Sequence, residues 1–391
     1  MKVDADQLNE VLLPVHSAKG LPNAVYRDRE LFEFERDEVF SRTWVALTFT
    51  SDAPQKRYVY PVDFMGMPVL LVRTEGEFRV YHNVCSHRGM TLVKEAGPAK
   101  RVIRCPYHSW SYDLDGDLVS TPHIGGIGSN DVEGFDRRLH GLKEIRSAIW
   151  MGVIFINLDG AADEFDSHTE SLQSRWEDYA GRGSLNHLVA PGEDQRIDLA
   201  LNCNWKLPIE NYCEAYHLPW IHPGLNSYSP LSAHESFSLD EKTSGQISHQ
   251  YTLTDIAGLK LPLFSGWQQD MQSHAEYFSF YPNLLLGIQA DHAFAIVLMP
   301  KAPDRTEERL QLMYVNHEAS SDTYRPCREK IIKAWREVFI EDIDAVEGMQ
   351  KGRESSGFDG GTFSPVMDTS THHFHRWVAK RYLSALADVK Y

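Results

Sequence analysis

The stretch "CSHRGMTLVKEAGPAKRVIRCPYHSW", from Cys85 to Trp110, twice places a thiol close to an imidazole. Cys85 lies two residues before His87, and Cys105 lies three residues before His108. Thiolates suit iron–sulfur and zinc sites and imidazole suits zinc or iron, so the pattern predicts a metal site. In a [2Fe–2S] cluster with mixed ligands, two Cys hold one iron and two His hold the other. Zinc is the alternative, although a zinc finger usually has a Cys pair and then a His pair.

The residues around this motif have the pattern of a small all-β domain. From about Trp44 to Asp159, β-rich runs alternate with turn signals such as Asp115-Gly116. Gly89 follows the first thiol–imidazole pair, where the chain must bend around a cluster. After Gly160 the pattern changes to long helical segments and a few strands, which predicts a mixed α+β domain.

A second candidate metal site lies in "NWKLPIENYCEAYHLPWIHP", which contains His217 and His222. On an unbroken helix these two side chains would point about 140° apart and would not share a metal. Pro219 lies between them, removes a helix hydrogen bond and clashes with the preceding turn. We therefore expect a break at Pro219 that lets both imidazoles converge.

The long helix expected over residues 324–355 offers a third ligand. Asp342 falls in the centre of its apolar stripe, where an unpaired carboxylate is costly and a metal would remove the cost. The apolar members of the stripe are Trp335, Val338, Phe339, Val346 and Met349. Two His and one carboxylate are the ligand set of non-haem Fe(II) oxygenases. The alternatives are a hydrogen-bonded core Asp, ordinary core histidines, and a rival cluster at His372, His373 and His375.

Together the two motifs resemble the Rieske non-haem iron oxygenases, the terminal oxygenase α subunits of the ring-hydroxylating type. "CSHRG…CPYHSWSYDLDG" is similar to the Rieske signature, and "EDIDAVEGMQ" (341–350) is similar to the segment that supplies the family's aspartate ligand. The resemblance implies two cofactors, a [2Fe–2S] Rieske cluster and a mononuclear Fe(II). The implied cluster ligands are Cys85, His87, Cys105 and His108, and the implied iron ligands are His217, His222 and Asp342.

The resemblance also implies the architecture, which is α+β. We expect an N-terminal segment over residues 1–43 that packs on the catalytic domain, and a Rieske domain over residues 44–160. Residues 161–391 would form a helix-grip catalytic domain, an antiparallel sheet with long helices. Family members form head-to-tail trimers, in which the cluster of one subunit serves the iron of its neighbour, so a homotrimer is implied.

Glu214 is the expected bridge between the two metals. Glu214 and His217 are three residues apart, so their side chains are neighbours on one helical turn, and Glu210 lies on the same face. A carboxylate there can accept a hydrogen bond from a ligand imidazole. The second ring nitrogen of His108 of the partner subunit could bond to Glu214 and complete an electron-transfer path. The alternative is that Glu214 forms a surface ion pair.

Glu214 also bears on the substrate, because the aromatic-ring dioxygenases of the family usually carry Asp there. Glutamate resembles the subgroup of choline monooxygenase and the glycine betaine and carnitine oxygenases. The resemblance implies hydroxylation and N-demethylation of a small quaternary ammonium compound by O2. Hydroxylation of an aromatic or aromatic-acid substrate is the alternative. Aromatic faces attract a cation, and the candidate pocket residues are Trp267, Tyr277, Phe278, Phe280 and Tyr281.

Composition and charge narrow the remaining classes. The net charge of the 391-residue chain is −16, which argues against nucleic-acid binding. No apolar run is long enough for a membrane span, and the acidic N-terminus is not typical of a secretory signal. Five cysteines, an odd number, argue against a disulfide framework, so we expect a cytoplasmic protein. The absence of a G-x-G-x-x-G pattern predicts a separate NAD(P)H reductase, with flavin or iron–sulfur centres.

An electron carrier is the rival from another class. A Rieske ferredoxin needs only the first of the two motifs, whereas this chain has a long second half that carries His217, His222 and Asp342. The sequence does not identify the exact substrate, whether one or two oxygen atoms are inserted, or whether a β subunit or ferredoxin takes part.

Overall fold

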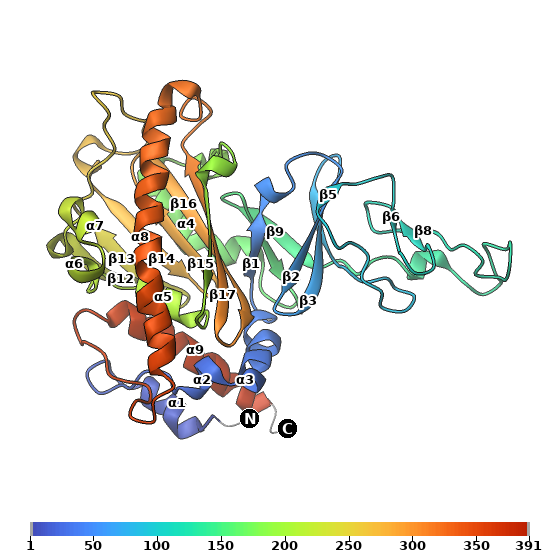
Figure 1. Ribbon diagram of the computed structural model, residues 1–391, viewed down its shortest axis with the longest axis horizontal. Coiled ribbons are helices and arrows are strands. Elements are labelled where there is room, and N and C mark those ends of the chain that lie inside the picture. Colours follow the sequence, from blue (N-terminus) through green and yellow to red (C-terminus); the bar gives the residue numbers. More distant parts are fainter. Residues whose placement is uncertain (1–2, 389–391) are drawn as a thin grey trace.

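The computed structural model describes residues 3–388 and consists of a large mixed part and a smaller β-rich part that projects from it (Figure 1). The smaller part carries the Cys/His motif, and the larger part carries the His–His–Asp group. This arrangement confirms the expected α+β class, with an all-β domain beside an antiparallel sheet with long helices. Within residues 3–388, no helix is both long enough and apolar enough to cross a membrane.

Two small antiparallel sheets build the projecting part. One has the strand order β4-β3-β2-β5 and the other has the order β6-β7-β8. Their bounds are β2 Tyr58–Phe64, β3 Met67–Arg73, β4 Phe78–His82, β5 Gly97–Pro98, β6 Ile103–Arg104, β7 Ser111–Tyr112 and β8 Leu118–Ser120. The first thiol–imidazole pair follows β4 and the second lies between β6 and β7, so each pair sits in a loop held at its base by strands.

A third sheet joins this part to the rest of the molecule. It contains β1 Val45–Phe49, β9 Arg146–Trp150 and β10 Val153–Asn157, in the order β1-β10-β9. Asn283 of the larger part accepts from the backbone N–H of Ala46 at 2.9 Å and donates to its carbonyl at 2.8 Å. The buried side chains of this sheet are divided between two hydrophobic cores, and each of these cores also contains side chains of the large sheet.

The large sheet has seven antiparallel strands in the order β11-β17-β16-β15-β14-β13-β12. Their bounds are β11 Arg196–Leu201, β12 His234–Asp240, β13 Thr243–Ser248, β14 Ala275–Phe280, β15 Leu284–Ile288, β16 His292–Ala302 and β17 Arg305–Tyr314. The few strands expected after Gly160 are present, and they belong to one seven-stranded sheet.

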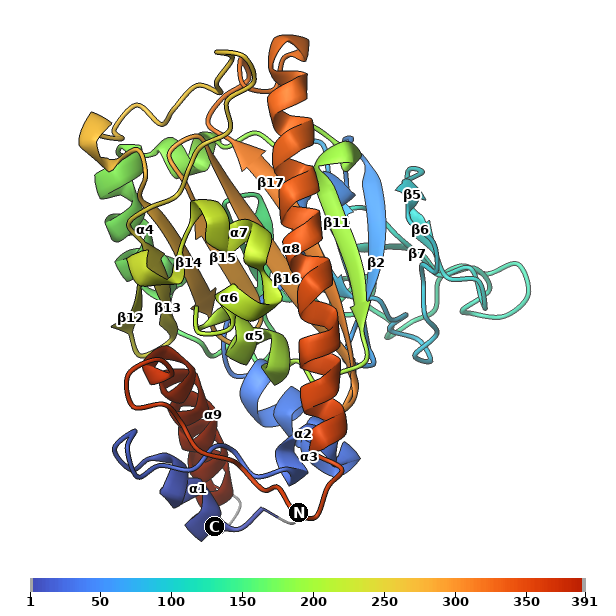
Figure 2. The same ribbon diagram turned by 60° about the vertical axis from the view of Figure 1, so that its left-hand side comes forward.

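Two long helices cover opposite faces of this sheet (Figures 1 and 2). Helix α8 spans Arg325–Gly352 and helix α4 spans Phe165–Ala180. The ring of Trp335 on α8 lies 5.9 Å from that of Tyr277, whereas Trp176 on α4 stacks 6.4 Å from Phe278. Successive side chains of a strand point to opposite faces, so Tyr277 and Phe278 belong to different layers.

The N-terminal helices lie against the C-terminal helix (Figure 2). Their bounds are α1 Ala5–Val11, α2 Ala24–Arg27, α3 Arg29–Phe34 and α9 Thr369–Asp388. A fully buried ion pair anchors this region, because Lys206 Nζ lies 2.5 Å from a carboxylate oxygen of Glu35. Burial lowers the pKa of Lys206, and the negative charge of Glu35 opposes that shift.

Candidate metal centres

The two thiol–imidazole pairs lie in loops of the same construction. Cys85 donates its backbone N–H to the carbonyl of Met90 at 2.8 Å, and Cys105 donates to the carbonyl of Trp110, also at 2.8 Å. Each hydrogen bond closes a loop of the same length, and both cysteine side chains are buried. The sequence spacing therefore folds into two matching loops that present their ligand side chains in the same way.

A left-handed residue at the same position completes each loop. Gly89 has φ 71° and donates to the carbonyl of Cys85 at 3.0 Å. Ser109 has φ 59° and donates to the carbonyl of Cys105 at 3.1 Å. The turn at Gly89 is where the sequence analysis placed it. The equivalent turn at Ser109 was missed, because a serine in this conformation gives no signal in the sequence.

The two imidazoles lie beside each other at the tip of the projecting part. The ring centres of His87 and His108 are 4.8 Å apart, and Trp110 stacks on His87 at 4.6 Å and 9°. The Sγ of Cys85 lies 3.2 Å from the hydroxyl of Tyr112. Two buried thiols below two adjacent imidazoles fit a [2Fe–2S] cluster with mixed ligands.

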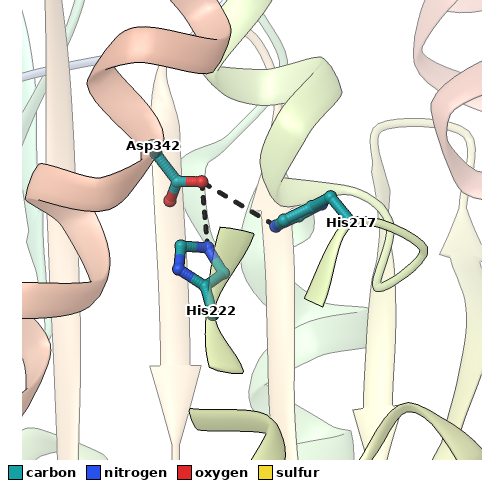
Figure 3. A group of neighbouring side chains, drawn as sticks. All are labelled: His217, His222 and Asp342. Carbon is teal, nitrogen blue, oxygen red and sulfur yellow. Dashed lines mark ion pairs between the residues drawn. The ribbon is translucent and has the colours of Figure 1, made fainter. Parts of the chain in front are cut away.

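His217, His222 and Asp342 converge in the larger part (Figure 3). Asp342 Oδ1 lies 2.9 Å from Nε2 of His222 and 3.8 Å from Nε2 of His217. One ligand atom from each residue lies within 4.8 Å of the other two. This donor set fits a mononuclear non-haem iron with open coordination positions.

The two histidines flank a very short helix. His217 directly precedes α6 (Leu218–Ile221), and His222 lies between α6 and α7 (Pro223–Tyr228). The expected break inside a helix at Pro219 is wrong, because Pro219 lies in the first turn of α6, where proline is tolerated. The preceding helix α5 spans Lys206–Tyr212 and ends before His217, so the two histidines lie at the two ends of the short helix α6 and can face one point.

Each histidine has a carboxylate behind it. Glu214 Oε1 lies 2.6 Å from Nδ1 of His217, so the expected contact is present, although both residues lie between α5 and α6 and not on one helical turn. Glu341 Oε2 lies 2.8 Å from Nδ1 of His222. Such carboxylates fix the ring orientation and leave the Nε2 atom to face the metal. The sequence did not predict that Glu341 contacts His222.

Asp342 is itself oriented by a neutral donor. Asn211 Nδ2 donates to Asp342 Oδ1 at 3.1 Å. Burial lowers the pKa of His222, but the hydrogen bond and the charge of Asp342 outweigh burial, and the pKa is raised overall. These contacts hold the donor atoms together and place a negative charge where a cation would bind.

A buried carboxyl of the sheet also lies near Asp342. Glu308 of β17 lines a small cavity together with Asp342. Burial raises the pKa of Glu308 to about 8, and the negative charge of Asp342 adds to the shift. The sequence analysis did not identify Glu308. It lies at every second position of β17 together with Thr306 and Leu310, and all three side chains are buried.

A narrow cavity of about 40 Å³ opens beside the three residues. Its apolar and aromatic walls are Tyr212, Leu218, Leu225, Tyr277, Trp335, Val338 and Phe339. Its neutral polar walls are Asn211, Gln246 and His234; burial lowers the pKa of His234. The residues that the structure describes around this cavity include no Lys or Arg.

Of the five aromatic pocket residues expected, only Tyr277 lines this cavity. Phe278 and Phe280 belong to the core on the other face of the sheet, as does Trp267, which stacks on Phe264. Tyr281 lies past the end of β14, and its hydroxyl lies 3.1 Å from Nδ1 of His373. The correction follows from strand alternation, since adjacent residues of β14 cannot line one pocket.

The cavity walls that the sequence analysis did not identify come from the apolar stripe of α8. Trp335, Val338 and Phe339 lie on the same side of the helix as Asp342 and pack toward the sheet. Met349, which was also placed in this stripe, is 37% exposed near the end of the helix. The stripe was identified in the sequence as the surroundings of the iron ligand, but not as the wall of its cavity.

The histidines of α9 do not form a rival cluster, because they point to three different partners. His372 Nε2 lies 2.9 Å from the carbonyl of Val11, and His373 Nδ1 lies 3.1 Å from the hydroxyl of Tyr281. His375 accepts from the N–H of Leu21 through Nδ1 at 3.0 Å. These side chains tie α9 to its neighbours.

Glu210 lies away from Glu214, contrary to the expectation of a shared face. It is buried among Tyr26, Arg353 and His375, with carboxylate contacts of 2.5, 3.3 and 3.2 Å. Burial raises the pKa of Glu210, but its contacts with His375 and Arg353 dominate and lower it to about 2. The chain leaves the helix after Tyr212, so the spacing of four residues no longer places Glu210 and Glu214 side by side.

The two sites lie at opposite ends of the molecule (Figure 1). The Cys/His loops lie next to β6, and the His–His–Asp group lies between α6 and α8. An all-β domain with two Cys–His loops, joined to a sheet and long helix that present two His and one Asp, defines a Rieske-type non-haem iron oxygenase.

Comparison with known proteins agrees with this class. The family model of the ring-hydroxylating α subunit catalytic domain matches residues 188–384, and that of the Rieske [2Fe–2S] domain matches residues 43–132. The chain belongs to the ring-hydroxylating oxygenase α subunits. Its cofactors are therefore a Rieske cluster and a mononuclear iron, and its electrons come from a separate reductase.

The relatives are named for several different substrates. The carnitine monooxygenase oxygenase subunit of Escherichia coli (strain K12) is 26% identical over 376 residues, 92% of this chain and 93% of that one. The chloroplastic choline monooxygenase of Arabidopsis thaliana is 27% identical over 373 residues, 93% of this chain and 83% of that one. The glycine betaine monooxygenase oxygenase subunit of Pseudomonas aeruginosa (strain UCBPP-PA14) is 35% identical over 214 residues, 53% of this chain and 45% of that one.

Solved structures show the same fold with different ligands. A quaternary ammonium Rieske monooxygenase in complex with L-carnitine has a TM-score of 0.75 at 22% identity, over 97% of this chain and 99% of that one. Naphthalene 1,2-dioxygenase from Rhodococcus sp., bound to indole, has a TM-score of 0.77 at 19% identity, over 97% and 98%. The fold alone therefore does not select the substrate class.

Proposed function

We propose that this oxygenase hydroxylates a methyl group of a small quaternary ammonium compound, such as a betaine, carnitine or a choline-like molecule. The observation that carries the proposal is the aromatic-walled cavity beside His217, His222 and Asp342. Aromatic faces attract a quaternary cation, with a contribution of about 0.5–2 kcal/mol when the site is dry. Relatives that are named for carnitine, choline and glycine betaine support the same substrate class.

We assign the cofactor ligands by site. The cluster ligands are Cys85, His87, Cys105 and His108, and the iron ligands are His217, His222 and Asp342. We also propose three parts: an N-terminal segment (1–43), a Rieske domain (44–160) and a catalytic domain (161–391). When bound, the iron supplies O2 activation, with electrons that originate from NAD(P)H and arrive through the reductase.

The residues of the chain bind and orient the substrate. Trp335, Phe339 and Tyr277 are the aromatic walls against which the cation would bind. Asn211 and Glu341 hold Asp342 and His222 in position. Insertion of one oxygen atom into an N-methyl C–H bond gives an N-hydroxymethyl group, while two electrons and two protons reduce the other oxygen atom to water. Loss of formaldehyde and a proton then leaves the demethylated amine.

Electron delivery places a second requirement on the chain. Because the two sites lie at opposite ends of the molecule, we assign the cluster and the iron that work together to adjacent subunits of a homotrimer. Glu214 contacts His217 through one carboxylate oxygen and is only partly buried. It would accept a hydrogen bond from His108 of the partner subunit and join the two sites across the interface.

Formaldehyde release tests this function. The holoenzyme with a matched reductase, NADH and O2 is incubated with choline, glycine betaine, carnitine and benzoate, and formaldehyde and hydroxylated products are measured. We expect formaldehyde from at least one quaternary ammonium compound, in proportion to NADH consumed. Hydroxylation of benzoate with no turnover of any ammonium compound would favour the aromatic alternative, which the naphthalene dioxygenase fold accommodates.

A further inference from the structure

A large basic hollow lies apart from both metal centres. It encloses about 730 Å³ between α9, the chain around Trp44, the start of α4 and the β12–β13 turn, and we call it the α9 groove. Its basic residues are Arg42, Lys242, Arg376, Lys380 and Arg381. Only two acidic residues, Asp163 and Glu241, are among its described lining residues. This excess of positive charge occurs in a chain whose net charge is −16.

The basic side chains of α9 have no anionic partner among residues 3–388. Arg376, Lys380 and Arg381 form no ion pair with a described carboxylate, and neither does Lys242. Arg381 lies over the ring of Trp377, 5.3 Å from its centre. Burial lowers the pKa of Arg381, and the charge of Glu241 offsets this only in part. Arg376 and Lys380 are exposed, whereas Arg381 is partly buried, so a bound anion would offset the desolvation of Arg381.

A buried imidazole without a partner supports the same conclusion. His168 of α4 lines the groove, and its Nε2 atom is buried without a hydrogen-bond partner. Burial lowers the pKa of His168 to about 3, with smaller effects from Lys242 and Arg381, so its ring is neutral. A rotation of this side chain that exposes Nε2 to the groove would let the neutral ring donate to an oxygen atom of a bound anion. Buried polar atoms in native proteins nearly always have a partner.

We propose that the α9 groove is a binding site for a small multivalent oxyanion, a phosphate or a polycarboxylate. Arg381 and His168 would contact it deep in the groove, and Arg376, Lys380 and Lys242 would surround it. The hollow has the size of a small-molecule pocket, about 300–1,000 Å³, whereas a protein partner usually docks on a flatter surface. The groove shares no lining residue with the cavity at the iron site, so this site is distinct from the proposed substrate pocket.

Calorimetric titration of the holoenzyme with inorganic phosphate and with citrate, at low ionic strength, tests the proposal. The double variant Lys380→Gln/Arg381→Gln removes two charges from the groove. The matched control Lys94→Gln/Lys100→Gln removes two exposed charges from the projecting domain. We expect the wild type to bind the anion saturably and the groove variant to bind it at least about tenfold more weakly. The control should bind it with the affinity of the wild type, and added salt should weaken binding. The two titrations show whether phosphate or carboxylate is preferred.

Two results would overturn the proposal. Equal affinity in all three proteins would show that the anion binds elsewhere. No saturable binding of either anion, combined with a raised KM for the reductase in the groove variant alone, would make the groove a protein docking surface instead.

Thermal denaturation distinguishes a loss of anion binding from misfolding of the variant. The variant loses a desolvated charge, so without anion its Tm should be equal to or above that of the wild type. Phosphate or citrate should raise the Tm of the wild type and the control but not that of the variant. The conservative Arg381→Lys protein should retain part of this response.

Discussion

The Nδ1 atom of His222 lies 2.8 Å from a carboxylate oxygen of Glu341, the residue directly before Asp342 on α8. Consecutive residues of one helix therefore contact the two nitrogen atoms of the same imidazole, because Asp342 lies 2.9 Å from Nε2. Glu341 fixes the ring while Asp342 faces the metal position beside it. The helix thus contributes both a proposed iron ligand, Asp342, and the group that orients a second proposed ligand, His222.

Replacement of Glu341 should weaken iron binding without removing the cluster. In Glu341→Ala, His222 loses its orienting partner, and we expect iron affinity to fall by about 10- to 100-fold. Glu341→Gln keeps an acceptor for the Nδ1–H and should lose less. Metal analysis after dialysis against a chelator measures the effect, with exposed Asp344→Ala as the control on the same helix. Equal iron retention in Glu341→Ala and Asp344→Ala would contradict the role.

Asp342→Ala should lose the mononuclear iron and all turnover. The variant removes the only carboxylate of the three-residue group and leaves two imidazoles to hold the metal. The red-brown absorbance of the cluster and its low average g in the reduced state should be unchanged, because the Cys/His loops lie in another domain. An active variant with full iron content would show that the third ligand is elsewhere.

Glu214→Gln and Glu214→Ala should slow electron delivery while both metals stay bound. We expect turnover to fall by at least about tenfold, or roughly 1.4 kcal/mol of barrier, because the bridge between subunits is interrupted. Single-turnover oxidation of the reduced cluster, in the presence of substrate and O2, measures this step directly. Glu235→Gln on β12 is the control. Cluster oxidation at the wild-type rate would exclude a role for Glu214.

The two faces of β14 should respond differently to substitution. Trp335→Leu and Tyr277→Leu remove ring faces from the cavity and should raise KM for the ammonium substrate by about 2- to 30-fold, the range of a cation–π contact. Phe278→Leu, on the opposite face, should lower the stability of the protein but leave KM unchanged. If Tyr277→Leu and Phe278→Leu raised KM equally, the assignment of the cavity walls would be contradicted.

The Glu210 cluster should make stability depend on acid pH. The pKa of Glu210 is lowered from 4.5 to about 2, so its ionised form stabilises the native state above pH 4.5. This stability is lost as the pH falls from 4.5 to about 2. Glu210→Gln should lower the free energy of unfolding by about 3–5 kcal/mol at neutral pH, because Arg353 is left buried without its carboxylate partner.

Denaturant unfolding between pH 7 and pH 3 measures this prediction. The difference in free energy of unfolding between wild type and Glu210→Gln should become smaller as the pH falls, because protonation removes the charge of Glu210 from the wild type. Glu95→Gln, at an exposed position of the projecting domain, is the control and should match the wild type throughout. A constant difference across this range would contradict the assigned cause.

The sequence by itself determined the features whose geometry is local. The spacing of Cys85, His87, Cys105 and His108 predicted the two loops, since a short loop closed by strands has few conformations. The period of α8 placed Asp342 on the buried face, because a helix of that length keeps its phase from end to end. The three-residue spacing of Glu214 and His217 predicted their contact.

Tertiary structure decided which of the remaining side chains meet. Strand alternation shows that Tyr277 and Phe278 face opposite ways, but only the packing of α8 on one face and α4 on the other assigns Tyr277 to the cavity. The ends of α5 and α6 separate Glu210 from Glu214 and turn His217 and His222 toward one point. These outcomes depend on contacts between segments far apart in the chain, and such contacts leave no periodic pattern in a single sequence.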